Sequence, residues 1–244
     1  MAKDLTIPKL FMRDNIFCPG CGHGIIQKVL AEAMEELGVA DNAILANAVG
    51  CTCNTAVYFG VDIIQAAHGR ASATAQGIKA VRPDNFVFAY QGDGDAGAIG
   101  FSETMYAAKR NAPITVFFVN NGVFGMTGGQ TAPTSLMDQK TVTAVDGVNY
   151  DNFGKPLHLA ELISQFDVGY VARGSVANFK EITKLKEYIR KAIQCQIDGK
   201  GYSFVEILSP CPINWKMKPV DCMERLEQVS MEEFKCGELK GLGE

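Results

Sequence analysis

Apolar segments with the character of buried strands alternate with helical patterns along almost the whole chain. Residues 113–121, PITVFFVNN, are apolar nearly throughout, as expected of a parallel strand that is covered on both faces. Residues 22–37 carry apolar side chains at helical spacing, and Gly38 follows as a typical helix end. The alternation predicts an α/β fold with a doubly wound parallel sheet, which binds ligands at the carboxyl ends of its strands. Further strands are expected at 43–50, 86–91, 168–173 and 202–209, and further helices at 71–81, 98–111, 157–166 and 178–197.

Length and charge limit the classes of function. A chain of 244 residues fits one large domain, and a net charge of -4 without any basic run argues against nucleic acid or an anionic membrane as a partner. The N-terminal residues lack the apolar core of a signal peptide, and no apolar run reaches the roughly 18 residues that span a membrane. We therefore expect a cytoplasmic protein. Residues 1–217 are expected to form the main domain, and the charged residues 218–244 a tail or a partner-docking arm.

The stretch GDGDAGAIG at 92–100 matches the glycine spacing of a dinucleotide-binding loop, yet it carries Asp93 and Asp95 where a phosphate would bind. A dinucleotide site also needs an acidic residue about 20 positions further on to bind the ribose. The next predicted strand ends instead in Asn120 and Asn121. Because both motifs follow the carboxyl ends of consecutive strands, one helical crossover would place Asp93 beside Asn121.

Carboxylate and amide oxygens are ligands that Mg²⁺ prefers, and the ion would anchor a diphosphate that the aspartates alone would repel. The alternative is that both motifs are ordinary strand-to-helix turns, in which Gly, Asp and Asn are common. The GDG-to-NN pattern resembles the thiamine diphosphate motif of thiamine-dependent enzymes. The resemblance implies that Asp93, Asn121 and the main-chain carbonyl of Val123 bind Mg²⁺, with the glycine-rich residues 122–130 lying over the diphosphate.

Eight cysteines are many for a reducing compartment, and metal ligation is the main alternative to free thiols. Cys18 and Cys21 form a C-x-x-C pair, Cys51 and Cys53 follow a predicted strand, and Cys211 lies just beyond the last strand. A sheet that brings its strand ends together can gather these thiols at one site. Four thiolates suit either a structural zinc ion or an iron-sulfur cluster, and their spacing does not separate the two.

Thiamine chemistry favours the cluster, because decarboxylation of a 2-oxoacid leaves an electron-rich carbon and zinc accepts no electrons. Six motifs together resemble the beta subunit of 2-oxoacid:ferredoxin oxidoreductases along most of the chain: CPGCGHG, VGC, HGRASATAQGIK, GDGDAGAIG, NNGVFGMTGGQTAPT and SPCP. The resemblance implies a [4Fe-4S] cluster on Cys18, Cys21, Cys51 and Cys211. Cys53 departs from the family pattern; it is the alternative third ligand, and Cys51 is favoured because it directly follows the strand-ending glycine.

The same resemblance assigns residues to the cofactor site. His23, His68 and Arg70 are candidate catalytic residues, although a histidine in a glycine-rich turn also serves as a structural group. Thr52 and Met126 are expected to face the thiazolium or the substrate. The implied cofactor-binding residues are Gly50, Cys51, Thr52, Gly92, Asp93, Gly94, Asp95, Asn121, Val123, Gly125, Met126 and Thr127.

The resemblance implies an enzyme that oxidatively decarboxylates a 2-oxoacid with coenzyme A and passes electrons to ferredoxin. It also implies an alpha subunit that supplies the thiamine-activating glutamate, together with gamma and ferredoxin-like delta subunits. The short chain is similar to the 2-oxoglutarate or branched-chain 2-oxoacid enzymes. Two alternatives stay open, a non-redox thiamine diphosphate decarboxylase or synthase subunit with a structural zinc site, and a non-catalytic iron-sulfur electron-transfer module.

Overall fold

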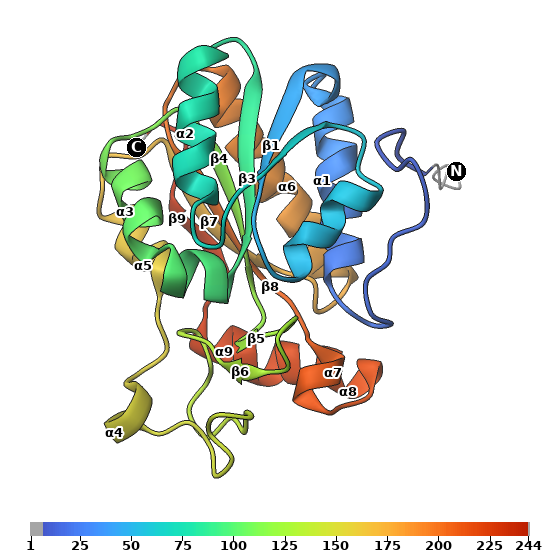
Figure 1. Ribbon diagram of the computed structural model, residues 1–244, viewed down its shortest axis with the longest axis vertical. Helices are drawn as coiled ribbons and strands as arrows, with labels where there is room; N and C mark the ends of the chain where they lie inside the picture. Colours follow the sequence, from blue (N-terminus) through green and yellow to red (C-terminus); the bar gives the residue numbers. More distant parts are fainter. Residues whose placement is uncertain (1–6, 244) are drawn as a thin grey trace.

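A central sheet with helices on both faces forms the body of the molecule (Figure 1). The computed structural model describes residues 7–243. Seven strands lie in the order β2-β1-β3-β4-β8-β7-β9, and every neighbouring pair is parallel except β7 with β9. The predicted α/β fold with a mostly parallel sheet is therefore confirmed. The strands are β1 Ala43–Asn47, β2 Asp62–Gln65, β3 Phe86–Gly92, β4 Thr115–Asn120, β7 Tyr170–Ser175, β8 Ser203–Leu208 and β9 Gly237–Lys240.

Two groups of helices cover the two faces of this sheet. The apolar residues of β4 pack against both groups. Phe117 packs in the core beneath α1 and α6, whereas the next residue, Phe118, packs in the core beneath α2, α3 and α5. Successive strand residues point to opposite faces, so a strand covered on both sides is apolar throughout. None of the helices within residues 7–243 has both the length and the apolar content to cross a membrane. The enclosing helices are α1 His23–Glu36, α2 Ala71–Val81, α3 Phe101–Lys109, α5 Leu159–Ser164 and α6 Phe179–Ile197.

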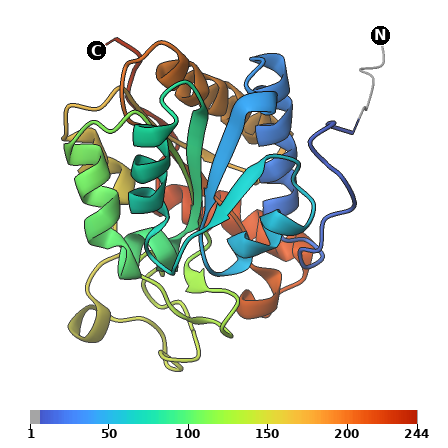
Figure 2. The same cartoon turned by 45° about the horizontal axis from the view of Figure 1, so that its top comes forward.

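The carboxyl ends of the strands carry the irregular part of the chain. A small antiparallel hairpin pairs β5, Val123–Phe124, with β6, Gln130–Thr131, directly after β4. The long segment that follows, residues 132–158, includes the short helix α4, Tyr150–Phe153, and projects from this end of the molecule in both ribbon views (Figures 1 and 2). The glycine-rich stretch after β4 thus lies at the end of the sheet where ligands are expected.

Residues 218–243, which belong to the segment expected as a tail or a partner-docking arm, pack onto the domain. Helix α8, Pro219–Arg225, continues through the π-helical segment Leu226–Ser230 into α9, Met231–Glu233, and the chain then forms β9, which pairs antiparallel with β7 at the edge of the sheet. The side chains of Leu226 and Phe234 are 1% exposed. Leu226 and Phe234 lie among charged residues in short helical elements, which give too little periodic signal to predict this packing. A docking role for the segment stays a prediction.

A buried ion pair joins β7 to β8. Arg173 and Glu206 are opposite each other in register, both side chains are 0% exposed, and their Nη2 and Oε2 atoms lie 2.8 Å apart. Glu161 also accepts from Arg173 Nη1 at 2.7 Å, and Asn120 Nδ2 donates to Glu206 Oε1 at 2.7 Å. Because each carboxylate oxygen of Glu206 has a donor and Arg173 has two carboxylate partners, the network ties the end of β4 to β8 and to the strand beyond it, β7.

Replacing Glu206 by glutamine is expected to lower the free energy of unfolding by about 3 kcal/mol, because Arg173 keeps its charge without its fully buried partner. Urea denaturation followed by circular dichroism measures the change. The matched control is Lys235→Ala, which breaks the exposed pair of Lys235 with Glu232 and should cost less than about 1 kcal/mol. An equal decrease in the free energy of unfolding in the two variants would contradict a larger contribution of the buried pair.

Candidate active site

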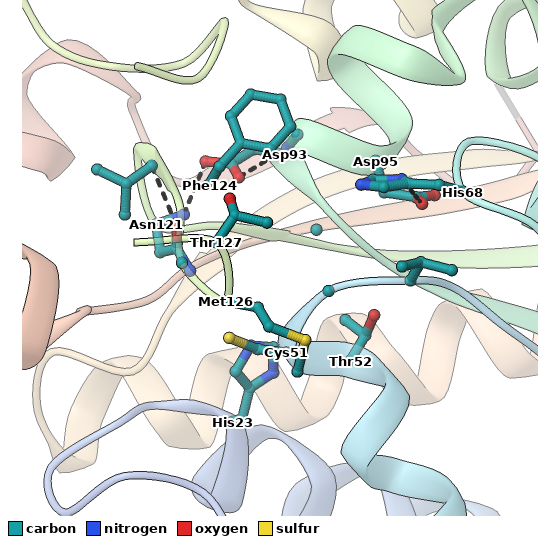
Figure 3. Close-up of a pocket in the computed structure, with 16 residues that line it drawn as sticks. His23, Cys51, Thr52, His68, Asp93, Asp95, Asn121, Phe124, Met126 and Thr127 are labelled. Atoms are coloured by element: carbon teal, nitrogen blue, oxygen red, sulfur yellow. Dashed lines mark hydrogen bonds and ion pairs between the residues drawn. The ribbon is translucent and has the colours of Figure 1, made fainter. Parts of the chain in front are cut away.

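A pocket opens where β1, β3 and β4 end and where the β5–β6 hairpin folds over them (Figure 3). The twelve residues that the resemblance implied as cofactor-binding, from Gly50 to Thr127, all lie in its wall. The lining residues are His23, Val49, Gly50, Cys51, Thr52, His68, Gly92, Asp93, Gly94, Asp95, Asn121, Val123, Phe124, Gly125, Met126 and Thr127. The fold thus brings together segments that are far apart in the sequence, as expected at the carboxyl ends of parallel strands.

Asp93 is the acceptor at the centre of the hydrogen bonds in this pocket. Its Oδ2 atom accepts from the backbone of Gly122 at 2.7 Å, the backbone of Asn121 at 3.3 Å and the hydroxyl of Thr134 at 2.7 Å. Its Oδ1 atom accepts from the backbone of Gly94 at 2.8 Å. Only 2% of the residue is exposed, and burial raises its pKa to about 6 despite these donors. A buried carboxylate of this kind is suited to a bound cation.

Asn121 completes the oxygen-rich side of the pocket. The backbone N–H of Val123 donates to Asn121 Oδ1 at 3.2 Å, and the indole N–H of Trp215 donates to the Asn121 carbonyl at 3.0 Å. The carboxylate of Asp93, the amide oxygen of Asn121 and the carbonyl of Val123 are hard oxygen donors of the type that Mg²⁺ takes together with diphosphate oxygens. These residues fit the predicted Mg²⁺ site in their chemistry, and their role as ligands stays a prediction.

Binding of Mg²⁺ and thiamine diphosphate is expected to weaken by about tenfold per pH unit below pH 6, because the metal needs the ionised Asp93 carboxylate. The pKa of Asp93 is raised above the unfolded value of 3.8, so the protonated carboxyl stabilises the metal-free fold below about pH 4. This contribution to the free energy of unfolding is lost as the pH rises through about 6. Equilibrium dialysis at pH 5 and pH 7 measures the affinity. Equal affinities, with circular dichroism showing a folded chain at both values, would contradict the assignment.

Asp95, the second acid of the loop, is committed to a different set of contacts. Its Oδ2 atom accepts from the backbone of Gly69 at 2.8 Å and lies 2.7 Å from Nδ1 of His68, and its Oδ1 atom accepts from Gln91 Nε2 at 2.6 Å. Gly69 has φ of +76°, and a Cβ atom there would lie 2.7 Å from the backbone nitrogen of Gly100. Asp95 therefore fixes the tight turn that carries His68 to the edge of the pocket.

The cysteines predicted to hold the cluster come from three separate segments at this end of the sheet. Cys51 lines the pocket, Cys18 is exposed, and Cys21 and Cys211 are partly buried. The pKa of Cys21 is raised to about 12, mainly by burial and to a smaller extent by the nearby thiols of Cys211, Cys51 and Cys18. Burial likewise raises the pKa of Cys51 to about 11. Buried neighbouring thiols of this kind need a positive partner to ionise, which iron would provide.

Gly125 lies where the predicted cluster cysteines adjoin the wall of the pocket. A Cβ atom at this position would lie 3.2 Å from Sγ of Cys51 and 3.8 Å from Sγ of Cys211. Among residues 7–243, no three His, Cys, Asp or Glu side chains converge as ligands of a single metal ion. Each thiolate of a [4Fe-4S] cluster binds a different iron, so cluster ligands stand further apart than the ligands of one ion. The cluster on Cys18, Cys21, Cys51 and Cys211 stays a prediction.

Comparison with known proteins identifies the family. A family model described as thiamine pyrophosphate enzyme, C-terminal TPP binding domain, matches residues 42–207. The 2-oxoglutarate synthase subunit KorB of Methanocaldococcus jannaschii is 34% identical over 223 residues, which are 89% of this chain and 78% of that protein. The chain belongs to the family of 2-oxoacid:ferredoxin oxidoreductase beta subunits.

Two further relatives agree with this membership. The ketoisovalerate oxidoreductase subunit VorA of Methanothermobacter thermautotrophicus is 44% identical over 219 residues, which are 89% of this chain and 46% of that protein. The chain therefore spans about half the length of this relative. A structure of 2-oxoglutarate:ferredoxin oxidoreductase from Magnetococcus marinus, with 2-oxoglutarate, coenzyme A and succinyl-CoA bound, has a TM-score of 0.76 at 26% identity and covers 91% of this chain and 73% of that chain.

The candidate catalytic residues of the beta subunit differ in their placement. His23 and His68 line the pocket, whereas Arg70 lies outside it and forms an ion pair with Glu103 at 3.0 Å. His23 is 2% exposed, its Nδ1 atom lies 2.5 Å from the hydroxyl of Tyr90, and burial lowers its pKa to about 4, which keeps the imidazole neutral near pH 7. Two of the three candidates can therefore reach a bound ligand.

The sequence analysis did not identify four residues that support the beta-subunit pocket. The hydroxyl of Thr134 donates to Asp93, and the hydroxyl of Tyr90 forms a hydrogen bond with His23. The side chains of Asn214 and Trp215 donate to backbone carbonyls of the loop after β4. Thr134 and Trp215 lie within or beside quoted motifs, NNGVFGMTGGQTAPT and SPCP, but their residue types indicate no particular chemistry. Only their contacts in the folded chain assign them to the site.

Proposed function

We propose that this chain is the thiamine diphosphate- and [4Fe-4S]-binding beta subunit of an enzyme that oxidises 2-oxoacids. The proposed reaction converts a 2-oxoacid and coenzyme A into acyl-CoA, CO₂ and one proton, and two electrons pass singly through the cluster to two ferredoxin molecules. The observation that carries the proposal is the position of Cys51, which lines the pocket and also lies with Cys211 beside Gly125. A cluster on these thiols would adjoin the bound thiamine.

In this proposal, Mg²⁺ and thiamine diphosphate bind at the carboxyl ends of β3 and β4. Asp93, Asn121 and the carbonyl of Val123 would hold Mg²⁺, and the glycine-rich residues 122–130 would lie over the diphosphate. Thiamine diphosphate supplies the carbanion chemistry that releases CO₂ from a 2-oxoacid. His23, held in place by Tyr90, would present a neutral imidazole to the ligand.

The proposed partners are supported by the contacts of the two aspartates, and the proposed substrate by the names of the relatives. Neither Asp93 nor Asp95 is free to activate the aminopyrimidine ring, because both accept several hydrogen bonds, so we infer that an alpha subunit supplies the activating glutamate. Gamma and ferredoxin-like delta subunits would complete the complex. The higher identity to a ketoisovalerate oxidoreductase subunit than to a 2-oxoglutarate synthase subunit favours a branched-chain 2-oxoacid as substrate.

The test is made on the native complex, purified under anaerobic conditions through a tag on this chain. Iron, acid-labile sulfide, zinc and thiamine diphosphate are measured, followed by viologen reduction with coenzyme A and a panel of 2-oxoacids. We expect iron, sulfide and thiamine, and the fastest reduction with branched-chain 2-oxoacids. Stoichiometric zinc without iron would support the non-redox thiamine enzyme instead. A cluster without thiamine in the assembled complex would support the electron-transfer module.

A further inference from the structure

Helix α7, Pro212–Trp215, connects the cysteine end of the site with the thiamine end. It begins directly after Cys211 and lies beside the β5–β6 hairpin in Figure 1. The side-chain nitrogen of Asn214 donates to Sγ of Cys211 at 3.2 Å and to the carbonyl of Gly125 at 2.9 Å. A primary amide nitrogen carries two hydrogens, so Asn214 uses one on each side of the site.

The surroundings of Asn214 restrict this amide to its position. A Cβ atom at Gly129 would lie 2.9 Å from Asn214 Oδ1, and one at Gly125 would lie 3.8 Å from Asn214 Nδ2. The loop between β5 and β6 therefore approaches the amide closely at Gly129, where a side chain would clash, whereas a Cβ atom at Gly125 would make an ordinary contact with the amide. The close packing of this loop on α7 thus depends on Asn214 and on Gly129.

The neighbouring residue makes an independent contact to the metal end of the same loop. Trp215 donates its indole N–H to the carbonyl of Asn121 at 3.0 Å, and the guanidinium of Arg225 lies 5.3 Å from the centre of its ring. Trp215 makes no hydrogen bond to sulfur among the contacts described. Substituting the two residues therefore separates an effect on the thiol from an effect on the loop. Asn214 contacts both the thiol and the loop, whereas Trp215 contacts the loop without a hydrogen bond to the thiol.

We propose that Asn214 is a positioning residue that couples the cluster to the thiamine loop, an inference that rests on the proposed function. Its N–H···S bond stabilises negative charge on the Cys211 thiolate, and reduction of the cluster increases that charge. Hydrogen bonds to the sulfurs are among the determinants of a cluster's reduction potential. The bond therefore raises the potential and favours acceptance of an electron, while the second bond holds Gly125 next to Cys51 and Cys211.

The test is an electron paramagnetic resonance redox titration of the anaerobic complex, with thiamine diphosphate affinity measured by equilibrium dialysis. Asn214→Leu removes both donor hydrogens and keeps the number and branching of the side-chain heavy atoms. We expect about a tenfold lower ratio of reduced to oxidised cluster at a fixed potential, which is about 59 mV for a one-electron couple, and weaker thiamine binding. Trp215→Phe should weaken thiamine binding and leave the midpoint potential unchanged. Asn152→Leu, the same change on the exposed helix α4, should alter neither.

An unchanged midpoint potential in Asn214→Leu, or an equal shift in Trp215→Phe, would overturn the proposal. If Asn214→Leu fails to retain the cluster, Asn214→Asp is measured; it keeps the shape, replaces the donors by a carboxylate and should lower the potential further. Loss of the cluster from both variants in a folded chain would show a structural role only and would also overturn the proposal. Absence of iron from the unaltered complex would instead reject the proposed function itself.

Discussion

Asp93→Asn is expected to abolish retention of thiamine diphosphate while leaving the visible absorption of the iron-sulfur cluster intact. The substitution keeps the size of the side chain but removes the charge that would hold Mg²⁺. It also places an amide N–H₂ group among donors such as the N–H of Gly122 and the hydroxyl of Thr134. Loss of residues that only support a metal ligand costs roughly 10–100-fold in affinity, so loss of a direct ligand should cost at least about 100-fold.

The measurement is equilibrium dialysis of Mg²⁺ and thiamine diphosphate against the anaerobic complex, with the cluster spectrum recorded on the same sample. Asp62→Asn, on the exposed face of β2, is the control for the same chemical change and should bind thiamine normally. Because the buried Asp93 carboxylate is costly to ionise without a cation, the variant is expected to remain folded. Normal thiamine binding by a folded Asp93→Asn variant would reject the Mg²⁺ assignment.

Cys51→Ser is expected to lose most of the iron and sulfide, whereas Cys53→Ser is expected to retain them. The two residues are separated by a single threonine, so the pair of variants tests position with matched chemistry. Cys51 lines the pocket and lies beside Gly125 with Cys211. Cys51 also lies close enough to Cys21 to raise the pKa of its thiol. A serine hydroxyl binds iron poorly compared with a thiolate, so the loss should be large for the residue that is the ligand.

Iron and sulfide analysis, with the visible spectrum, measures the outcome on complexes purified in parallel. Cys195→Ser is an unsuitable control, because Cys195 is fully buried in the core and its replacement would disturb packing. Loss of the cluster in Cys53→Ser together with its retention in Cys51→Ser would show that Cys53, and not Cys51, is the ligand. Full retention in both variants would reject a ligand from this segment altogether.

The fold was predictable where one physical signal dominated a segment. The predicted helix at 71–81 is α2 with the same bounds, and the predicted strand at 86–91 is β3 with one further residue. Cys195 lies on the apolar face of the long helix α6 and is fully buried there. These elements bury wide apolar faces, so their periodicity is evident without knowledge of the tertiary structure.

Short or exposed elements gave no such signal. Strand β2 is largely exposed, and β9 lies in a charged segment whose pairing with β7 depends on the neighbouring strand. The ion pair of Arg173 with Glu206 joins residues that each stand alone in an apolar strand. Their pairing follows from strand register, a property of the assembled sheet.

The chemistry of the pocket was readable from residue types and order. Asp93 and Asn121 end consecutive predicted strands, and parallel strands of one sheet bring their carboxyl ends together, so the sequence alone determined that these two residues meet. Their resemblance to a thiamine motif was confirmed at the level of the family. The role of Asp95 depended on the turn at His68 and Gly69, and the bond of Asn214 to Cys211 and Gly125 depended on α7 folding back beside the hairpin. Local order along the chain specifies which strand ends meet, whereas loop packing sums many weak contacts between distant segments and exists only in the folded molecule.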